Sequence, residues 1–276
     1  MKTAVLITFT ALFLTGCEQQ VADPDWPPFE EKLVVTGYAE LLESDSLYIS
    51  CQVGRTLPLD QPHDYHDYDV LDAEVHASGM TGGAKVLPVF DGGVYRRQVD
   101  FDTSVGKRVR IDVEWENYHC WGEAELDFTT VAVDTMYFLP TQYSPYMIAV
   151  FRPLKNRSVI YKIYTQVYDE FYGRWVWFNN HTYPSRWYSY EFTELSDGAV
   201  QLRTYMPSGS TIDSVRTRIT ILSEAYYTMQ QDDDNQFNDF GPFAPEEPSR
   251  KFNIQGEGIG YFWYQISGDW VTRPFK

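Results

Sequence analysis

Apolar and polar residues alternate along most of the chain, and this two-residue period is typical of a half-buried β-strand. The clearest example is residues 109–115, in which Val, Ile, Val and Trp alternate with Arg, Asp and Glu. Short segments of this kind recur between residues 32 and 128, separated by turn residues such as the Asp-Gly-Gly at 91–93. Their number, about seven, and their spacing predict a β-sandwich over residues 32–130.

The alternation continues beyond this region and predicts a second β-rich domain over residues 131–276. Only residues 223–231 favour a helix, because Ser223 is a good N-cap and the segment holds Ala, Met and Gln. The glycines at 256, 258 and 260 predict a tight turn or bulge where a side chain would clash. The expected fold class is therefore mainly β, with a sandwich followed by a β-rich domain that carries one short helix.

The N-terminus has the pattern of a lipoprotein signal peptide. Lys2 precedes an apolar run over residues 4–14, which is too short to cross a hydrocarbon core of about 30 Å as a helix. The run ends in Leu-Thr-Gly-Cys, so we expect cleavage after residue 16 and acylation of the Cys17 thiol, for example with palmitate. The alternatives are an ordinary signal peptide, or a membrane anchor, that happens to contain a cysteine.

Charge narrows the range of partners. The formal charge is −17, and loss of residues 1–16 makes it −18 because this segment holds Lys2 and no acidic residue. A chain this acidic repels phosphate backbones, so we expect no nucleic-acid partner. Residues 17–31 are rich in proline and acidic residues, which is typical of a solvated tether between a lipid anchor and a folded body.

Two further cysteines, Cys51 and Cys120, lie on the apolar faces of predicted strands. In an oxidising compartment, two inward-facing thiols are compatible with a disulfide that joins the sheets of a sandwich. The pattern is equally compatible with two separate buried thiols.

The richest aromatic stretch, residues 168–192, is the candidate binding region. Trp175 and Trp177 share one strand face, while Tyr183 and Trp187 flank a predicted loop. Exposed aromatic rings stack on sugars or bind a protein partner. The alternative is that one face of the stretch is core and the other rings are ordinary β-formers.

No pattern of residues indicates catalysis, a cofactor or a bound metal. The sequence contains neither a nucleophile elbow, nor a zinc-protease helix motif, nor a phosphate-binding loop. Acidic and histidine-containing segments at 63–69 and 232–239 match no metal-binding spacing and favour solvated loops.

Several segments, taken in order, are similar to the bacterial lipoprotein family called domain of unknown function 4249, typical of Bacteroidota. The matching segments are the opening strand 32–37, the strands at 72–75, 93–95 and 106–113, the helix start at 223–227, and Phe-Asn-Ile-Gln-Gly-Glu-Gly-Ile-Gly-Tyr-Phe at 252–262. Val109 and Trp263 depart from the residues usual in that family.

The resemblance implies an outer-membrane lipoprotein with an immunoglobulin- or transthyretin-like N-terminal domain. Genes of this family often neighbour TonB-dependent receptors, so it also implies an accessory role beside such a transporter. It implies no catalytic residue. The expected function is therefore non-enzymatic binding by a lipid-anchored protein of the outer membrane, on either the periplasmic or the surface side. The alternative is a carbohydrate-binding surface lipoprotein that uses the aromatic residues as a platform.

Overall fold

Three β-sheets make up the part of the chain that the structure describes. The computed structural model describes residues 29–42, 46–58, 64–79, 83–101, 107–142, 144–155, 159–184, 191–206, 212–230 and 252–275. The expected signal peptide, Cys17 and all but the end of the expected tether lie outside these residues. Within them, no helix combines the length and apolar character that a membrane crossing requires.

The strands follow the predicted alternation, with buried side chains at every second position of β1, β6 and β7, for example. In the first half of the chain the elements are β1 (Leu33–Leu42), β2 (Ser46–Arg55), a 3-10 turn η1 (Tyr65–Tyr68), β3 (Glu74–Ser78), β4 (Lys85–Val86), β5 (Val94–Asp100), β6 (Arg108–Trp115) and β7 (Tyr118–Glu125).

The second half continues with more strands and a helix over residues 224–230. The strands are β8 (Val133–Leu139), β9 (Tyr146–Phe151), β10 (Ile160–Asp169), β11 (Arg174–Tyr183), β12 (Phe192–Glu194), β13 (Val200–Tyr205), β14 (Ile212–Leu222), β15 (Ile254–Gly256), β16 (Gly258–Ser267) and β17 (Val271–Pro274). The fold class expected from the sequence, mainly β with a sandwich and one short helix, is confirmed.

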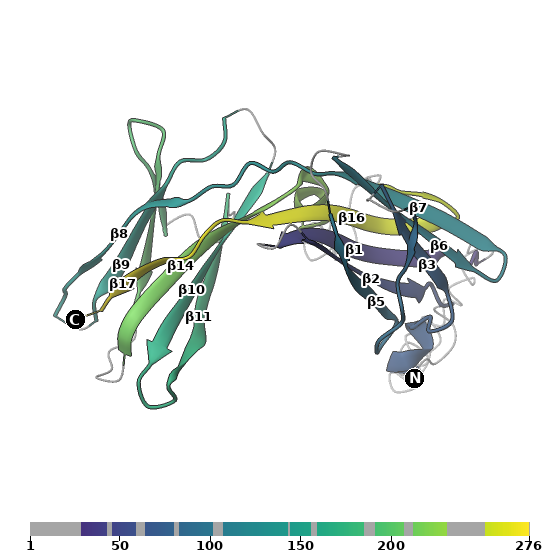
Figure 1. The fold of residues 1–276 in the computed structure, drawn as a ribbon, viewed down its shortest axis with the longest axis horizontal. Coiled ribbons are helices and arrows are strands. Elements are labelled where there is room, and N and C mark those ends of the chain that lie inside the picture. The colour runs from purple at the N-terminus through teal and green to yellow at the C-terminus, as the bar shows by residue number, and fades with distance from the viewer. Residues whose placement is uncertain are drawn as a thin grey trace, which may run out of the picture.

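One large sheet is shared by two sandwiches (Figure 1). It has eight strands in the order β11-β10-β14-β16-β1-β2-β5, with β17 paired to β14. The five-stranded sheet β15-β7-β6-β3-β4 covers one end of it, and Val35 of β1 lies in one apolar cluster with Ile111 of β6. The four-stranded sheet β12-β13-β9-β8 covers the other end, where the Thr217 hydroxyl of β14 contacts the Met147 sulfur of β9 at 3.4 Å.

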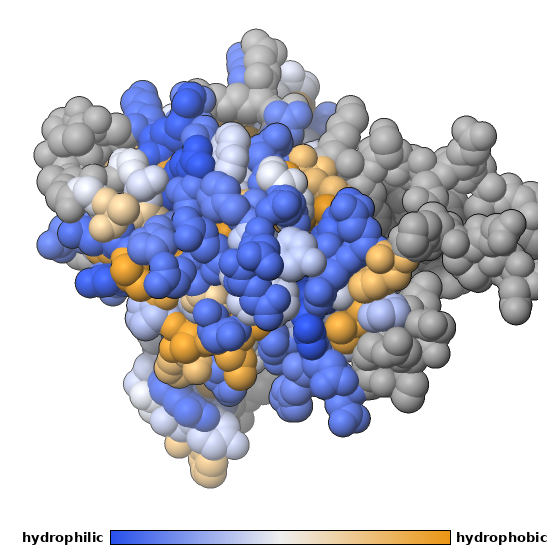
Figure 2. Space-filling model, turned by 90° about the vertical axis from the view of Figure 1, so that its right-hand side faces the viewer, coloured by the Kyte–Doolittle hydropathy of each residue, from blue (hydrophilic) through white to orange (hydrophobic). Residues whose placement is uncertain are grey.

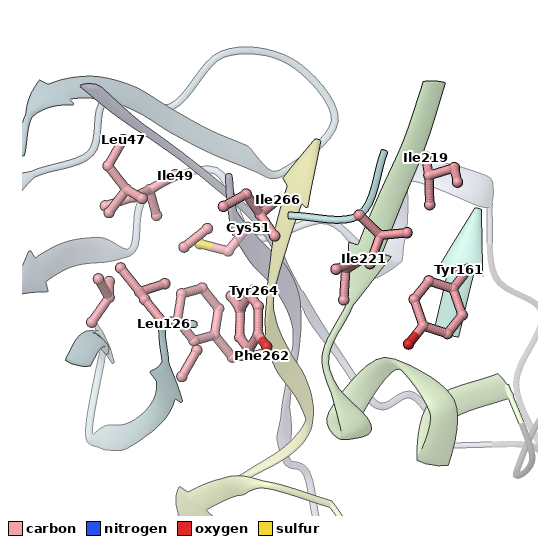
Figure 3. Packing of buried hydrophobic residues seen from close by; sticks show 14 of the residues in the cluster. Leu47, Ile49, Cys51, Leu126, Tyr161, Ile219, Ile221, Phe262, Tyr264 and Ile266 are labelled. Atoms are coloured by element: carbon pink, nitrogen blue, oxygen red, sulfur yellow. The ribbon is translucent and has the colours of Figure 1, made fainter. Parts of the chain in front are cut away.

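Strand β16 joins the two sandwiches. It runs parallel to β1 from the pair Leu33↔Gly258 to the pair Leu41↔Ile266, and its last residues pair with the end of β14. The buried cluster is therefore continuous, from Leu47 and Ile49 through Phe262 to Ile219 (Figure 3). Because the core runs through the junction, the two lobes in Figure 1 share a hydrophobic interior.

The C-terminal segment crosses the domain division expected at residue 130. Strand β15 pairs with β7 and β16 pairs with β1, so residues 254–267 complete the first sandwich and not only the second. The expected turn glycines lie here: Gly256 has a φ of +89°, and a Cβ at Gly258 would lie 2.6 Å from the Cys120 sulfur. Close packing of β16 against β7 therefore requires glycine.

Candidate binding face

Tryptophan, tyrosine and arginine side chains lie close together on the solvent-facing side of β10, β11 and β14 in the described structure. Alternation directs Ile163 and Val215 into the second sandwich, so their neighbours on β10 and β14 point outward. The register places Tyr164 opposite Arg218, and it places Gln166 between Arg216 on one side and Trp177 on the other. Residues from three strands are thus brought onto one face.

Two arginines and three aromatic rings form a continuous stack on this face, which we call the Trp–Arg stack. The Cζ atom of Arg216 lies 4.3 Å from the ring centroid of Trp175 and 4.5 Å from that of Trp270. The Cζ atom of Arg218 lies 4.7 Å from the centroid of Trp270 and 5.8 Å from that of Tyr164. Each guanidinium therefore contacts two rings, at distances at which cation–π attraction is effective.

Trp177 lies at the edge of the stack and is its most exposed ring. Its side chain is 58% exposed, and its ring centroid is 5.4 Å from Tyr164 and 6.3 Å from Trp270. Unlike Trp175 and Trp270, it lies over no arginine within the described residues. Trp177 is therefore the ring with most surface open to a ligand.

Stacking occupies the faces of the guanidinium groups and leaves their N–H edges for hydrogen bonds. A guanidinium has five N–H donors in its plane. The Nε of Arg216 donates to the Gln166 side-chain oxygen at 2.8 Å, whereas the Nε of Arg218 is buried and has no acceptor among the described residues. The stack thus holds both cations in place without using most of their donors.

The two arginines of the stack are neighbouring cations in an acidic chain. Neither Arg216 nor Arg218 forms an ion pair with any carboxylate in the described part of the chain. Burial lowers the pKa of Arg216, and the neighbouring charge of Arg218 lowers it further. By contrast, Arg152 contacts Asp134 at 2.9 Å and Asp197 at 2.8 Å, and the hydrogen bond to Asp197 raises its pKa.

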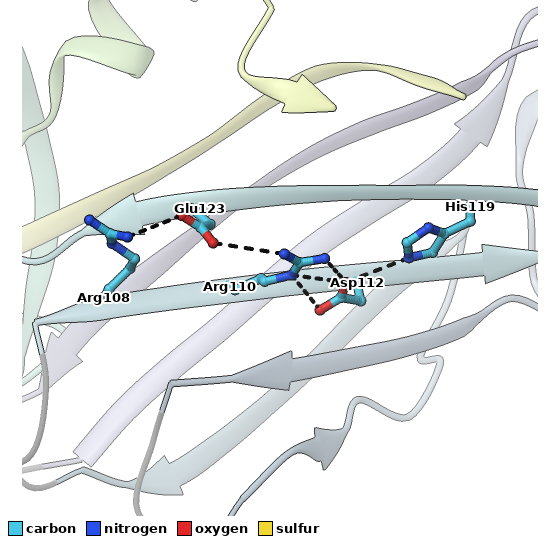
Figure 4. Close-up of polar contacts among 5 residues, drawn as sticks. All are labelled: Arg108, Arg110, Asp112, His119 and Glu123. Atoms are coloured by element: carbon cyan, nitrogen blue, oxygen red, sulfur yellow. Dashed lines mark hydrogen bonds and ion pairs between the residues drawn. The ribbon is translucent and has the colours of Figure 1, made fainter. Parts of the chain in front are cut away.

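A second charged cluster, on β6 and β7 of the first sandwich, is neutralised internally (Figure 4). Arg110 donates to both carboxylate oxygens of Asp112 at 2.9 Å, and Glu123 lies 3.7 Å from Arg108 and 3.9 Å from Arg110. His119 approaches Asp112 at 3.5 Å. Because acids and bases alternate there, the cluster presents little net charge to a ligand.

The end of the first sandwich is mostly hydrophilic. In Figure 2 the small hydrophobic areas on this side are separated by charged and polar residues. Exposed apolar side chains of this sandwich include Leu71, Val86 and Phe90, and the last of these lies under the Arg96 guanidinium at 3.5 Å. Scattered apolar residues of this kind are normal on a protein surface.

A cavity of about 590 Å³ lies beside the start of the helix, but its residues have structural partners. Its lining includes Lys107, Glu123, Ser223 and Asn253. The Ser223 hydroxyl accepts a hydrogen bond from the backbone of Tyr264, and the Asn253 amide bonds to the backbone of β16. These groups fasten the helix and the segment before β15 to the large sheet. In the described ranges, no three His, Cys, Asp or Glu side chains group as a metal ion would need.

The structure separates the residues that the sequence suggested for binding. Trp175 and Trp177 lie together in or beside the Trp–Arg stack. Tyr183 points to the opposite, inner face of β11: its hydroxyl donates to Glu194 at 2.7 Å, and burial together with this bond raises its pKa to about 12. Trp187 lies outside the described residues.

Trp270, Arg216 and Arg218 were not among the residues expected from the sequence. The two arginines repeat with the same two-residue spacing as Trp175 and Trp177, which indicates a shared face on each strand. That β10 lies between these strands, and that Trp270 folds back beside them, depends on tertiary structure. The local pattern therefore indicated which residues share a face on each strand, but not that these strands and Trp270 come together.

Cys51 and Cys120 lie in the two facing sheets of the first sandwich, on β2 and β7. Both are buried and free. Burial raises the pKa of each thiol to about 12, and for Cys51 the proximity of Cys120 adds to the effect. A disulfide between them stays a prediction of the sequence.

No protein-family model matches this chain, and no curated protein matches it. Among solved structures it is similar to bovine butyrophilin, at 9% identity over 69% of this chain and 92% of that one, with a TM-score of 0.22. It is also similar to the three N-terminal domains of the Highly Immunogenic Outer Capsid protein (Hoc) of bacteriophage RB49. That match has 9% identity over 86% of this chain and 70% of that one, with a TM-score of 0.24.

Likenesses this weak carry no argument about function. The class of the molecule is therefore defined by its own sheets and surface: it is a mainly β protein, built as β-sandwiches, with an exposed face of tryptophan and arginine side chains.

Proposed function

We propose that the mature chain is a lipid-anchored protein of the outer membrane that acts by binding, and that the Trp–Arg stack binds a protein partner. The lipid anchor rests on the signal peptide and Cys17. An accessory role beside a TonB-dependent transporter rests on the family resemblance, which makes such a receptor the first partner to test. The side of the membrane on which the protein lies is left open.

The observation that supports binding is the composition of the exposed face on β10, β11 and β14. Tryptophan, tyrosine and arginine are the residues most enriched among those that dominate the binding energy of protein interfaces. Here Trp175, Trp177, Trp270, Arg216 and Arg218 lie within one set of ring contacts on a solvent-facing sheet surface. Since mutual contacts already restrict these side chains, binding would lose less conformational entropy than it would with free side chains.

The second candidate function is carbohydrate binding, and the exposed ring of Trp177 favours it. A sugar ring needs an open aromatic face to stack on. The Arg216 guanidinium lies between Trp175 and Trp270, so it covers one face of each of these rings. The arrangement therefore supports a protein partner better than a flat sugar platform.

Co-purification through the native lipid anchor tests the proposal. The full chain is recovered from membranes in mild detergent, after cross-linking, as the wild type and as Trp177→Ala. Phe90→Ala is the matched control, because Phe90 is 67% exposed and lies in the first sandwich. We expect the same partner with the wild type and with Phe90→Ala, and several-fold less of it with Trp177→Ala. Recovery of the wild-type protein alone, or equal recovery with all three, would contradict the proposal.

A further inference from the structure

The Trp–Arg stack contains two cations without a carboxylate partner, in a chain whose formal charge is −17. Arg110 and Arg152 are paired with acidic residues, whereas Arg96 and Arg203 lie over the rings of Phe90 and Tyr146. Glu40, on the outer face of β1 in the same sheet, forms no ion pair with Arg216 or Arg218 in the described residues. The stack therefore places two neighbouring positive charges on one face of an acidic protein.

From these two cations, which lie over the same Trp270 ring, we infer that Arg216 and Arg218 recognise the carboxylates of an extended acidic segment in the protein partner. The inference rests on the proposed function and adds the chemistry of the ligand. Charge complementarity is its first support, because an acidic segment would be repelled by most of this protein and attracted to the stack.

The spacing of the two cations is the second support. Arg216 and Arg218 are two residues apart on β14 and point to the same side, so their Cα atoms are about 6.8 Å apart, at about 3.4 Å per residue. In an extended peptide, carboxylates at alternate positions repeat at the same distance on one side. Such a peptide lying along β14 could therefore place one carboxylate at each guanidinium.

Preorganisation is the third support. The Arg216 guanidinium has a ring on each side, at 4.3 Å and 4.5 Å, and its Nε is held by Gln166. Much of the rotamer freedom of a long arginine side chain is therefore already lost before any ligand binds. The remaining N–H groups lie in the guanidinium plane, where a carboxylate accepts hydrogen bonds in a bidentate manner.

The mutual repulsion of the two cations also favours an anion. Burial lowers the pKa of Arg216, and the nearby charge of Arg218, which lies over the same Trp270 ring, lowers it further. Lys162, which lies over the Tyr226 ring at 4.6 Å, adds a further positive charge on the outer side of β10. A bound carboxylate would relieve this repulsion.

The test is direct binding of synthetic peptides to the full-length lipoprotein in detergent, followed by fluorescence anisotropy. The main probe alternates Asp and Ser, and a second peptide has the same composition with the Asp residues in adjacent pairs. Polygalacturonate, an anionic polysaccharide, is the competing ligand class. The variants are Arg216→Gln and Arg218→Gln. Arg152→Gln is the matched control, because Arg152 is ion-paired on another surface.

We expect the alternating peptide to bind more tightly than the paired one and each stack variant to weaken it about tenfold, or about 1.4 kcal/mol. Arg152→Gln should leave the affinity unchanged. Arg218→Lys keeps the charge and loses the planar fork, so it should give an intermediate affinity even if the Gln variants fold poorly. Circular dichroism checks the fold of each variant.

Failure of the acidic peptide to bind, or an equal loss with Arg152→Gln, would overturn the inference. Tight binding of polygalacturonate without binding of the peptide would overturn it too, and would assign the stack to anionic saccharides. If Trp177→Ala loses the natural partner while Arg216→Gln and Arg218→Gln retain it, the proposed function stands and the acidic-segment inference fails.

Discussion

The guanidinium carbon of Arg218 lies 4.7 Å from the ring centroid of Trp270, which fixes the segment after β16 to the middle of the large sheet. The ring centroid of Trp270 also lies 4.5 Å from the Cζ atom of Arg216, so this single ring contacts both cations. It immediately precedes β17, whose residues pair with β14 from Val271↔Thr217 to Pro274↔Ser214. The Trp–Arg stack and the attachment of the C-terminal strand thus depend on the same side chain.

Replacing Trp270 by Ala should therefore lower the free energy of unfolding by about 2 kcal/mol. Two cation–π contacts of about 0.5–1 kcal/mol each are lost, together with the packing of the indole ring. Urea denaturation followed by circular dichroism measures the change. Trp177→Ala is the control, because this exposed ring contacts no arginine in the described structure. A loss with Trp177→Ala as large as that with Trp270→Ala would contradict the assigned role.

The sequence predicted what depends on local pattern and missed what depends on long-range pairing. Alternation placed Trp175 and Trp177 on one face because that inference needs only the period of a strand. The contacts of Trp270 could not be predicted, since they depend on β17 pairing with β14. Likewise, the sequence placed residues 256–265 within the second β-rich domain but gave no sign that they would run parallel to β1 near the start of the chain.

The orientation of Tyr183 could not be predicted from the sequence, for a different reason. Its position beside a proline suggested an exposed loop, yet β11 extends to this residue and directs the ring inward. An irregular register between β10 and β11, at Thr165 and Gln166, changes which residues face the core. Trp175 and Tyr183 are eight residues apart, so strict alternation would place them on the same face of β11. The irregularity shifts the pattern, and the two side chains lie on opposite faces.

Burial of the Cys51 thiol makes a prediction about pH for the reduced protein. Its pKa is raised to about 12 in the fold, whereas a free cysteine ionises near 8.5. Between these values the unfolded chain binds fewer protons than the folded one, so stability falls as the pH rises. We expect the advantage of the wild type over Cys51→Ala to shrink by about 1.4 kcal/mol per pH unit above pH 9. Urea titrations with reductant at pH 7.5, 9 and 10 measure it.

The same residues allow a test of the predicted disulfide. Protein purified without reductant is denatured and its reactive thiols are counted. A bridge between Cys51 and Cys120 would leave neither thiol reactive, and the pH effect above would appear only after reduction. Two reactive thiols in the unreduced protein would show that the disulfide predicted from the sequence does not form.

Gly258 should tolerate no side chain while Cys120 faces it. A Cβ at this position would lie 2.6 Å from the Cys120 sulfur and 2.7 Å from its Cβ. Gly258→Ala should therefore destabilise the fold by about 1–3 kcal/mol, the usual effect of overpacking. The double variant with Cys120→Gly should be less destabilised than the sum of the two single effects, because the clash is removed. Additive losses in the thermal unfolding of the three variants would refute the contact.

The lipid anchor is the prediction on which the location of the protein depends. In the leader Leu-Thr-Gly-Cys, only the Cys17 thiol provides the nucleophile that takes up diacylglycerol, so Cys17→Ser should abolish acylation and release the protein from membranes. Labelling with palmitate, followed by membrane fractionation, measures both effects. Cys51→Ser is the matched control, because it also removes a thiol but lies in the folded body and should leave the label unchanged. Palmitate incorporated into the Cys17→Ser variant, or an intact Met1 in the mature protein, would exclude a lipid anchor at this residue.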